Sequence, residues 1–407
     1  MNILYIDHYA GSDIHGMEFR PFYMAREWSK SGFNTTIVAA DYSHLRKLNP
    51  EISKDFEETK VEGINYCWIK TNRYQGNGVS RIISMMQFVS KLKRRAKYMA
   101  EKYKPDVVIC SSTYPFDTYA GQKIAKYAKA KLIHEVHDLW PLTPMELGGY
   151  SKNHPFIRVM AAAEKSAYRK SASIVSILPN IKEYLDTLNI NTKIVTVPNG
   201  VVTTDTSKLL PANELIKAKI DELHSEGNFV VGYAGGISIS NAIMDLIKAA
   251  ELLKDKKIAF IIIGDGIEKE GMVQYKEERN LDRVYFFNSI KKQEIHNTLS
   301  EMDALYIGSK KSRLYKYGMS PNKIYDYMLV GKPIISALDT EHSPLHYSNV
   351  SFQAEPENPV SIAKTIEDML GLEQSEINSI KDKSINCVLD NYTYEKLAEK
   401  FANEFKR

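Results

Sequence analysis

The most constraining feature of this 407-residue sequence is an alternation of short apolar runs with helical segments, which occurs twice along the chain. Segments of helical periodicity, such as Phe19–Ser31 with Gly32 as its stop, separate the runs. In the first half the β-rich runs are Ile3–Asp7, Thr35–Ala40, Asp106–Cys110, Lys131–Val136, Ile174–Ile177 and Ile194–Val197. Short apolar strands joined by amphipathic helices predict a parallel sheet covered on both faces.

The pattern breaks after Pro198-Asn199-Gly200, where Val201–Ala212 has the composition of a linker, and then resumes. The later strands are predicted at Phe229–Tyr233, Ala259–Ile263, Val284–Phe287, Ala304–Ile307 and Lys332–Ala337, and helices at Ala242–Lys254, Asn322–Val330 and Thr393–Lys406. A chain of this length exceeds one typical domain. We therefore predict two doubly wound α/β domains, residues 1–203 and 204–390, with the ligand site in the cleft between them.

Composition excludes several classes of protein. A net charge of +4 is too small for nucleic acid as the main partner. Met1 leads directly into the strand-like run Asn2–Ile6, so no secretory leader is expected, and no apolar stretch approaches the ~20 residues of a transmembrane helix. The three cysteines have no CxxC spacing, which argues against a zinc site or a disulfide framework. A cytoplasmic location is the expectation.

The segment Ser320–Ser336, SPNKIYDYMLVGKPIIS, carries the strongest chemical signal. Ser320 is a plausible N-cap and Pro321 a suitable first helical residue. A helix beginning there directs unpaired N–H groups and a partial positive charge outward, which suits a diphosphate. Lys323 adds a full charge, and Asp326, one turn later, could accept hydrogen bonds from ribose hydroxyls. The alternative is a capped surface helix with ordinary charges.

This segment resembles the donor-binding helix of retaining glycosyltransferases of family four, which have the GT-B fold. It most resembles the WbuB-like subgroup, N-acetyl-fucosamine transferases of bacterial surface polysaccharide synthesis, which share a P-N/S-K segment, Tyr-Met and Gly-Lys-Pro. The resemblance implies two Rossmann-like domains facing a central cleft, an acceptor-side first domain, a nucleotide-sugar-binding second domain, and a final helix, 391–407, that crosses back to the first. It also implies donor contacts from Ser320, Pro321, Asn322, Lys323 and Asp326.

Further segments resemble the family at the matching places. Tyr9–Arg20, YAGSDIHGMEFR, resembles the glycine-rich loop beside the donor phosphates. There, Gly16 would let the backbone approach the donor, and Glu18 and Arg20 would lie toward the acceptor or the sugar. Glu135–Pro141, EVHDLWP, resembles the segment that places a histidine near the reacting sugar. This makes His137 the candidate catalytic residue, with Asp138 on the acceptor or sugar side.

The second half continues the resemblance, with departures. Gly232–Gly236, GYAGG, matches the phosphate loop and puts Gly235 and Gly236 at the donor. Most family members carry two glutamates eight positions apart, where this sequence has Gly318 and Asp326. An arginine and a lysine common in the family are replaced by Gly236 and Asn241. Lys323 and the helix start must then neutralise more of the diphosphate charge, with possible help from Lys310, Lys311 and Arg313.

Two segments leave alternatives open. His134, Glu135, His137 and Asp138 could suggest a metal, but the HxxH spacing on a strand puts the two histidines on opposite faces, so no metal is expected. His137 is either a structural histidine or a hydrogen-bonding group for the donor sugar or the acceptor. Lys91–Lys104 has seven basic residues and one acidic residue, with Leu92 and Met99 as apolar members. It is either a helix lying on an anionic membrane or an ordinary solvated face.

The expected function is transfer of a sugar from a UDP-sugar to a lipid-linked saccharide in capsule or O-antigen synthesis. The resemblance implies an N-acetylated amino sugar and retention of anomeric configuration by front-face attack. Helix dipoles and Lys323 would neutralise the leaving phosphate, so neither a metal nor another cofactor is expected. The protein would be cytoplasmic or peripheral on the inner face of the membrane. The rival functions are a UDP-sugar 2-epimerase, a two-lobed sugar-binding protein and an inactive UDP-sugar-binding scaffold.

Overall fold

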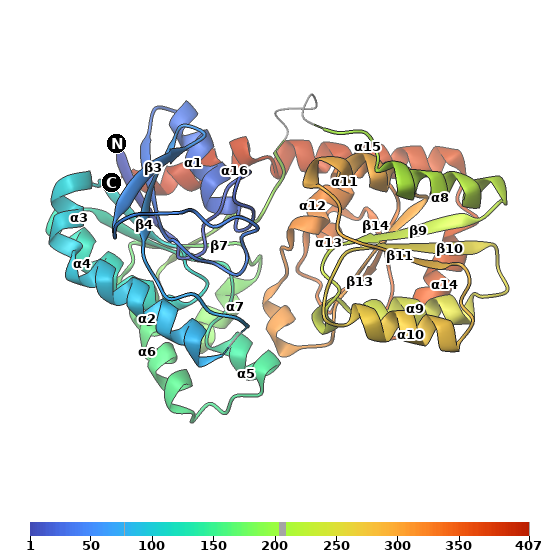
Figure 1. Ribbon diagram of the computed structural model, residues 1–407, viewed down its shortest axis with the longest axis horizontal. Helices are drawn as coiled ribbons and strands as arrows, with labels where there is room; N and C mark the ends of the chain where they lie inside the picture. The colour runs from blue at the N-terminus through green and yellow to red at the C-terminus, as the bar shows by residue number, and fades with distance from the viewer. Residues whose placement is uncertain (77, 203–208, 407) are drawn as a thin grey trace. The chain divides into compact units, whose positions relative to one another are not determined.

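The computed structural model describes residues 1–76, 78–202 and 209–406, and the chain forms two compact units (Figure 1). Unit 1 comprises Met1–Asn199 and Tyr394–Arg407, and unit 2 comprises Gly200–Thr393. The predicted boundary between residues 203 and 204, and half of the predicted linker, lie outside the described residues. Each unit is an α/β domain built on its own sheet, so the prediction of two such domains is confirmed.

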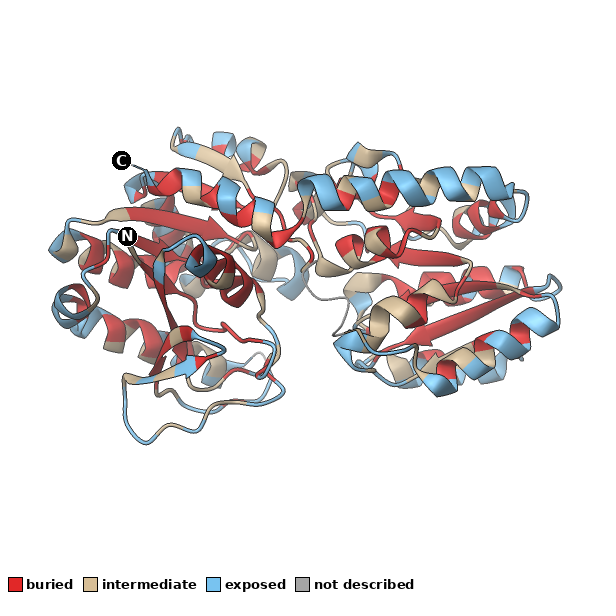
Figure 2. Cartoon of the chain, turned by 90° about the horizontal axis from the view of Figure 1, so that it is seen from above, coloured by how far each residue is buried: buried red, intermediate tan, exposed pale blue. Residues whose placement is uncertain are grey.

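Unit 1 contains an eight-stranded sheet in the order β3-β4-β2-β1-β5-β6-β7-β8. Its strands are β1 (Asn2–Ile6), β2 (Asn34–Ala40), β3 (Glu57–Val61), β4 (Ile64–Ile69), β5 (Val107–Cys110), β6 (Lys131–Val136), β7 (Ser173–Ser176) and β8 (Lys193–Thr196). Neighbouring strands are parallel except for β3, which pairs antiparallel with β4 at the edge. The six strands between the edge strands β3 and β8 are buried along nearly their whole length, and red arrows mark buried strands in Figure 2.

The helices of unit 1 all contain buried residues, except for the short helix Leu142–Gly148. They are α1 (Arg20–Lys30), α2 (Val79–Arg94), α3 (Ala96–Tyr103), α4 (Thr118–Ala128), α5 (Leu142–Gly148), α6 (Pro155–Lys170), α7 (Ile181–Thr187) and α16 (Tyr394–Ala402). Trp28 attaches α16 to α1, because its indole Nε1 donates to Ala398 O at 2.9 Å. Its ring packs edge-on against Phe401 and Phe405. The C-terminal helix is therefore part of the core of unit 1.

The basic segment Lys91–Lys104 is not one amphipathic helix. It spans the end of α2 and all of α3, which meet at Arg95. Leu92 and Met99, the apolar members of the predicted membrane-facing surface, are fully buried in the core of unit 1. Of the two alternatives, the membrane-lying helix therefore cannot use Leu92 and Met99, because these side chains pack in the core. The exposed residues of the segment are basic residues, Tyr98 and Glu101.

Unit 2 contains a six-stranded parallel sheet in the order β11-β10-β9-β12-β13-β14. The strands are β9 (Phe229–Ala234), β10 (Ile258–Ile263), β11 (Val284–Phe287), β12 (Ala304–Gly308), β13 (Ile334–Ala337) and β14 (Ser351–Gln353). The helices are α8 (Glu214–Ser225), α9 (Ile243–Leu252), α10 (Lys269–Glu278), α11 (Lys292–Ser300), α12 (Asn322–Val330), α13 (Pro344–Ser348), α14 (Pro359–Met369) and α15 (Gln374–Asn391).

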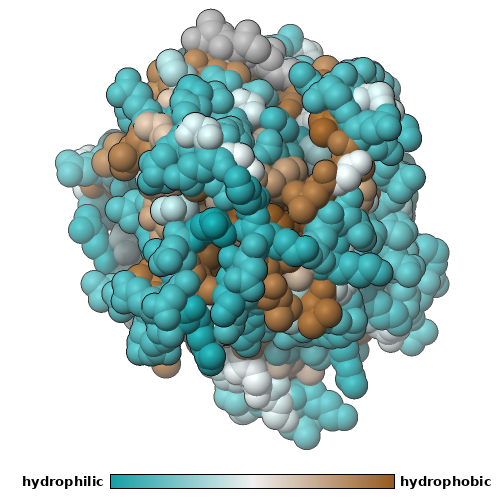
Figure 3. All heavy atoms as spheres, turned by 90° about the vertical axis from the view of Figure 1, so that its right-hand side faces the viewer, coloured by the Kyte–Doolittle hydropathy of each residue, from teal (hydrophilic) through white to brown (hydrophobic). Residues whose placement is uncertain are grey.

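Both faces of the unit 2 sheet are covered, because successive residues of one strand point into different cores. Val231 and Tyr233 of β9 belong to the cluster beneath α9 and α14, whereas Val230 and Ala234 belong to the cluster beneath α8 and α12. The face drawn in Figure 3 is mostly hydrophilic, with hydrophobic residues between the hydrophilic ones. No helix within the described ranges is long and apolar enough to cross a bilayer.

Candidate functional site

In unit 2, an unusual lysine lies at the beginning of α12. Lys323 Nζ donates to Tyr233 Oη at 2.7 Å and to Asn241 Oδ1 at 3.0 Å, and it lies 4.6 Å from the centre of the Tyr233 ring. These partners are all neutral, and none of the described carboxylates forms an ion pair with Lys323. Burial lowers the pKa of this lysine to about 7. The ammonium is thus held in place without a counter-charge, as an anion-binding group would be.

The loop after β9 brings its backbone close to this lysine. Gly235 has a φ of +151°, and a Cβ placed on it would lie 3.0 Å from both Lys323 Nζ and Tyr233 Oη. Only glycine therefore fits there without displacing the lysine. Gly236 has open space around its Cα, and its carbonyl accepts from Tyr233 Oη at 2.8 Å and Asn241 Nδ2 at 2.9 Å. Asn241, which stands where many family members have lysine, organises both the loop and Lys323.

The start of α12 differs from the prediction in one respect. The N-cap is Pro321 and the helix begins at Asn322, with no side-chain hydrogen bond to the first turn. Ser320 is not the N-cap, because its buried hydroxyl pairs with Tyr325 Oη at 2.6 Å instead. Ile324 N donates to Pro321 O at 3.1 Å, whereas the N–H groups of Asn322 and Lys323, at the first two helical positions, have no carbonyl to bind within the helix. These N–H groups lie in the same helical turn as Lys323, so the dipole of α12 and the charge of the Lys323 ammonium both favour an anion at this helix start.

Asp326 lies one turn further along α12 and is half-buried. Burial raises the pKa of its carboxyl, whereas Lys292 and His296 on α11 act in the opposite direction. Gly318, at the place of the family's first glutamate, has a φ of +100°. A residue with a side chain would be strained in this backbone conformation. The local fold therefore favours glycine at the position where the family has its first glutamate.

Lys310 and Lys311, in the loop after β12, form ion pairs with carboxylates of unit 2. Lys310 Nζ lies 3.3 Å from Asp245 and 2.9 Å from Glu357, and Lys311 Nζ lies 2.9 Å from Glu355. Their charges are neutralised by these carboxylates. Within the described part of unit 2, Lys323 is therefore better suited than either to meet an added anion.

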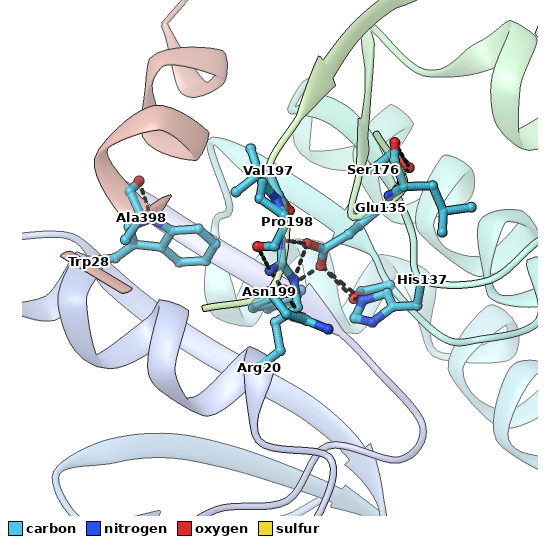
Figure 4. Close-up of polar contacts among 12 residues, drawn as sticks. Arg20, Trp28, Glu135, His137, Ser176, Val197, Pro198, Asn199 and Ala398 are labelled. Atoms are coloured by element: carbon cyan, nitrogen blue, oxygen red, sulfur yellow. Dashed lines mark hydrogen bonds and ion pairs between the residues drawn. The ribbon is translucent and has the colours of Figure 1, made fainter. Parts of the chain in front are cut away.

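In unit 1, a fully buried carboxylate organises the carboxyl end of the sheet (Figure 4). Glu135 Oε1 accepts from Arg20 Nε at 2.9 Å and lies 2.9 Å from Arg20 Nη2. The guanidinium also donates to the carbonyls of Val197 and Pro198, each at 2.7 Å. Burial opposes ionisation of Glu135, yet Arg20 and His137 hold its pKa well below the usual range. Arg20 was predicted to face the acceptor or sugar, but it is 1% exposed and binds protein groups.

His137 lies on the other oxygen of the same carboxylate. Its Nε2 is 3.3 Å from Glu135 Oε2 and 2.8 Å from Ser111 Oγ, which itself donates to Glu135 Oε2 at 2.7 Å. Burial alone would lower the pKa of His137, but the Glu135 carboxylate raises it above the ordinary value. Asp7, at the end of β1, also favours the charged imidazole, and burial raises the pKa of Asp7 to about 7. With 12% of its side chain exposed, His137 lines a small cavity with Thr113 and Trp140.

The remaining predicted residues of unit 1 lie nearby with different roles. Gly16 has a φ of +96° and closes a tight loop by donating to Ser12 O at 2.8 Å. Glu18 is half-buried, and its negative charge is close enough to Asp7 to raise the pKa of the Asp7 carboxyl. Asp138 Oδ1 accepts from Leu139 N and the Thr143 hydroxyl, so its carboxylate shapes the turn before α5.

Of the four residues that could have suggested a metal, His134 lies apart from Glu135 and His137. His134 stacks edge-on with Tyr168, with ring centres 5.6 Å apart, while His137 binds Glu135 and Ser111. Across the described ranges, no group of three or more histidine, cysteine, aspartate or glutamate side chains is placed to hold a metal ion.

Both halves of the chain match glycosyltransferase families. Residues 14–205 match the Glycosyltransferase Family 4 model, and residues 228–371 match the model for Glycosyl transferases group 1. A probable glycosyltransferase WbjE of Pseudomonas aeruginosa is 23% identical over 336 residues, which cover 81% of this chain and 80% of that protein.

Solved structures share the fold over the whole chain. Sucrose-phosphate synthase from Thermosynechococcus elongatus superimposes with a TM-score of 0.71 at 14% identity, covering 100% of this chain and 98% of that one. An E. coli trehalose-6-phosphate structure bound with UDP-2-fluoro glucose gives 0.72 at 10% identity, covering 100% and 99%. Anabaena HepE in complex with UDP-glucose gives 0.61 at 14% identity, covering 99% of each chain. The chain is therefore a glycosyltransferase of the GT-B fold, with a Glycosyltransferase Family 4 half followed by a Glycosyl transferases group 1 half.

Proposed function

We propose that this glycosyltransferase uses a UDP-sugar donor, whose diphosphate binds at the start of α12. The observation that carries the proposal is the Lys323 ammonium, which is held by two neutral partners at 2.7 and 3.0 Å without a carboxylate. A diphosphate would supply the missing counter-charge and accept from the first-turn N–H groups. The UDP-glucose and UDP-2-fluoro glucose bound by the Anabaena and E. coli structures support this nucleotide class.

The chemistry follows from charge. As the bond to the transferred sugar breaks, negative charge develops on the leaving phosphate, and Lys323 and the α12 dipole stabilise it without a metal. Asp326 would accept hydrogen bonds from the ribose hydroxyls, and the Gly235-Gly236 backbone would lie against the diphosphate. His137 would hydrogen-bond to the donor sugar or to the acceptor. In this proposal the anomeric configuration is retained, and the departing phosphate receives the proton of the acceptor hydroxyl.

The proposed substrates are those of surface polysaccharide synthesis. We expect an N-acetylated amino sugar on the donor and a lipid-linked saccharide as the acceptor. These finer assignments rest on the similarity of the Ser320–Ser336 segment to the WbuB-like subgroup.

A lipid-linked acceptor would bring the enzyme to an anionic membrane, and the outward side of α2 suits that contact. Val79, Ile83 and Met86 are 72%, 45% and 47% exposed and recur at helical spacing on one face. Lys93 and Arg94, which are exposed, continue the same face at the end of the helix. Apolar and basic side chains in succession fit a shallow insertion beside anionic headgroups. We place the proposed peripheral contact on this surface of α2.

The donor site is tested by calorimetric titration with UDP, with and without EDTA. We expect micromolar binding that is unchanged by EDTA and at least tenfold weaker in Lys323→Ala, a loss of about 1.4 kcal/mol. Lys332→Ala is the matched control, because burial also lowers the pKa of Lys332, which follows the opposite end of α12. Absence of UDP binding by the wild type, or equal losses in both variants, would refute the donor site. Binding that requires a metal would overturn the charge-neutralisation mechanism.

A further inference from the structure

We propose that Glu135 is a positioning residue, which fixes the proton on one ring nitrogen of His137. Through Arg20, it also connects that imidazole to the backbone of Val197 and Pro198. The inference rests on the proposed role of His137 in the transfer reaction. It goes beyond that role by assigning a function to three further side chains. Ser111 was not singled out in the sequence, Glu135 was considered there as a possible metal ligand, and Arg20 was predicted to face the acceptor or the sugar.

The geometry divides the two carboxylate oxygens of Glu135 between two tasks. Oε1 faces Arg20 at 2.9 Å, and the guanidinium continues to the carbonyls of Val197 and Pro198. Oε2 accepts from the Ser111 hydroxyl at 2.7 Å and from the buried Tyr5 hydroxyl, and it lies 3.3 Å from His137 Nε2. The carboxylate is 0% exposed, so solvent cannot rearrange these partners. The arrangement determines where Glu135 and the Nε2 edge of His137 lie.

Counting protons then assigns the histidine tautomer. Ser111 has one hydroxyl proton, which it donates to Glu135 Oε2. The 2.8 Å contact between Ser111 Oγ and His137 Nε2 therefore requires a proton on Nε2. The other nitrogen, Nδ1, has no hydrogen-bond partner among the residues that the structure describes. Nδ1 is thus left to meet a substrate, as an acceptor in the neutral ring or as a donor in the charged ring.

Several charged groups act on this imidazole. The carboxylates of Glu135 and Asp7 favour its charged form, whereas Arg20 disfavours it. His134, on the opposite face of β6, and Asp138, at the following turn, interact with it more weakly. Since Glu135 is in direct contact, removal of its charge should dominate any change in the titration of His137.

The test is a histidine-labelled NMR titration of the full chain, with the His137 signal assigned by its loss in His137→Gln. We expect the neutral ring to carry its proton on Nε2. In Glu135→Gln the pKa should fall by about one unit or more, as expected for loss of an adjacent opposite charge. The matched control is Glu164→Gln, which alters another buried carboxyl of unit 1 that hydrogen-bonds two tyrosines away from the site. It should leave the His137 titration unchanged.

Two outcomes would overturn the proposal: a proton on Nδ1 in the neutral wild type, or the same His137 pKa in wild type and Glu135→Gln. If the single variant does not fold because Arg20 is left unpaired, Arg20→Gln combined with Glu135→Gln removes both charges, and the pKa should still fall. Ser111→Ala keeps the ion pair and, because Glu135 Oε2 still lies 3.3 Å from Nε2, should weaken the preference for Nε2 without abolishing it. The readout needs no ligand, so its failure is separate from failure of UDP binding.

Discussion

The proposed donor site makes a definite prediction about pH. In the proposed site Lys323 would bind a diphosphate through its charged form, and burial lowers the pKa of this lysine to about 7. Raising the pH from 7 to 9 therefore removes the ammonium from the free protein before UDP arrives. Below the pKa the charge is present and binding is strong. Above it, each binding event must also take up a proton.

The size of the effect follows from this pKa. If only the charged lysine binds, the apparent Kd is multiplied by one plus ten to the power of pH minus pKa. This factor is about 2 at pH 7 and about 100 at pH 9, so the affinity should fall about fiftyfold, or about 2.3 kcal/mol. Residual binding by the α12 dipole would reduce the ratio. A fall of more than about tenfold would still identify the lysine.

The assay is calorimetric titration with UDP at pH 7, 8 and 9, a range in which the terminal phosphate, with a pKa near 6, is already ionised. Lys323→Gln is the control, because it keeps hydrogen-bonding capacity and cannot titrate. We expect weak binding with little pH dependence in this variant. A wild-type affinity that stays within about twofold across the range, or an equal decline in the variant, would refute the reasoning.

The other predictions concern the glycine loop and the membrane contact. Gly235→Ala should weaken UDP binding by about tenfold, because its Cβ would lie 3.0 Å from Lys323 Nζ, whereas Gly236→Ala meets open space and should weaken it less. Calorimetry that finds equal losses would contradict this account. Arg94→Glu on α2 should reduce co-sedimentation with phosphatidylglycerol vesicles about fivefold or more. The equivalent change Arg279→Glu, at the end of α10 in unit 2, should not, and equal effects would locate the contact elsewhere.

Much of the fold could be predicted because the signals are local. β6 and α12 have the predicted bounds, Lys131–Val136 and Asn322–Val330. β6 is a short segment with the apolar residues Leu132, Ile133 and Val136, and α12 is a periodic segment between a proline and a glycine. The strand β3, Glu57–Val61, was not predicted because it lies at the sheet edge and has only one buried residue, Val61. An edge strand has little apolar pattern to detect.

The site was predictable only where neighbours in sequence are also neighbours in space. Lys323 and the helix start follow from one motif, but the contact with Asn241 joins residues 82 positions apart. Arg20 was placed beside the substrate because its motif lies there. Its partners Glu135 and Pro198 are 115 and 178 positions away, so only the folded chain shows that its guanidinium is occupied. Long-range polar partners leave no periodicity in the sequence.

The two ends of unit 2 lie side by side. Val201 and Thr393 form a parallel bridge, and Val201 N donates to Tyr392 O at 2.9 Å. In its covalent topology, unit 2 is therefore a cassette inserted into unit 1, bounded by two adjacent strand-like crossings. A cassette with neighbouring ends can be exchanged by recombination without separating the ends of the host domain. Chimeras that replace residues 200–393 as a block are thus a practical route to combining unit 2 of one transferase with unit 1 of another.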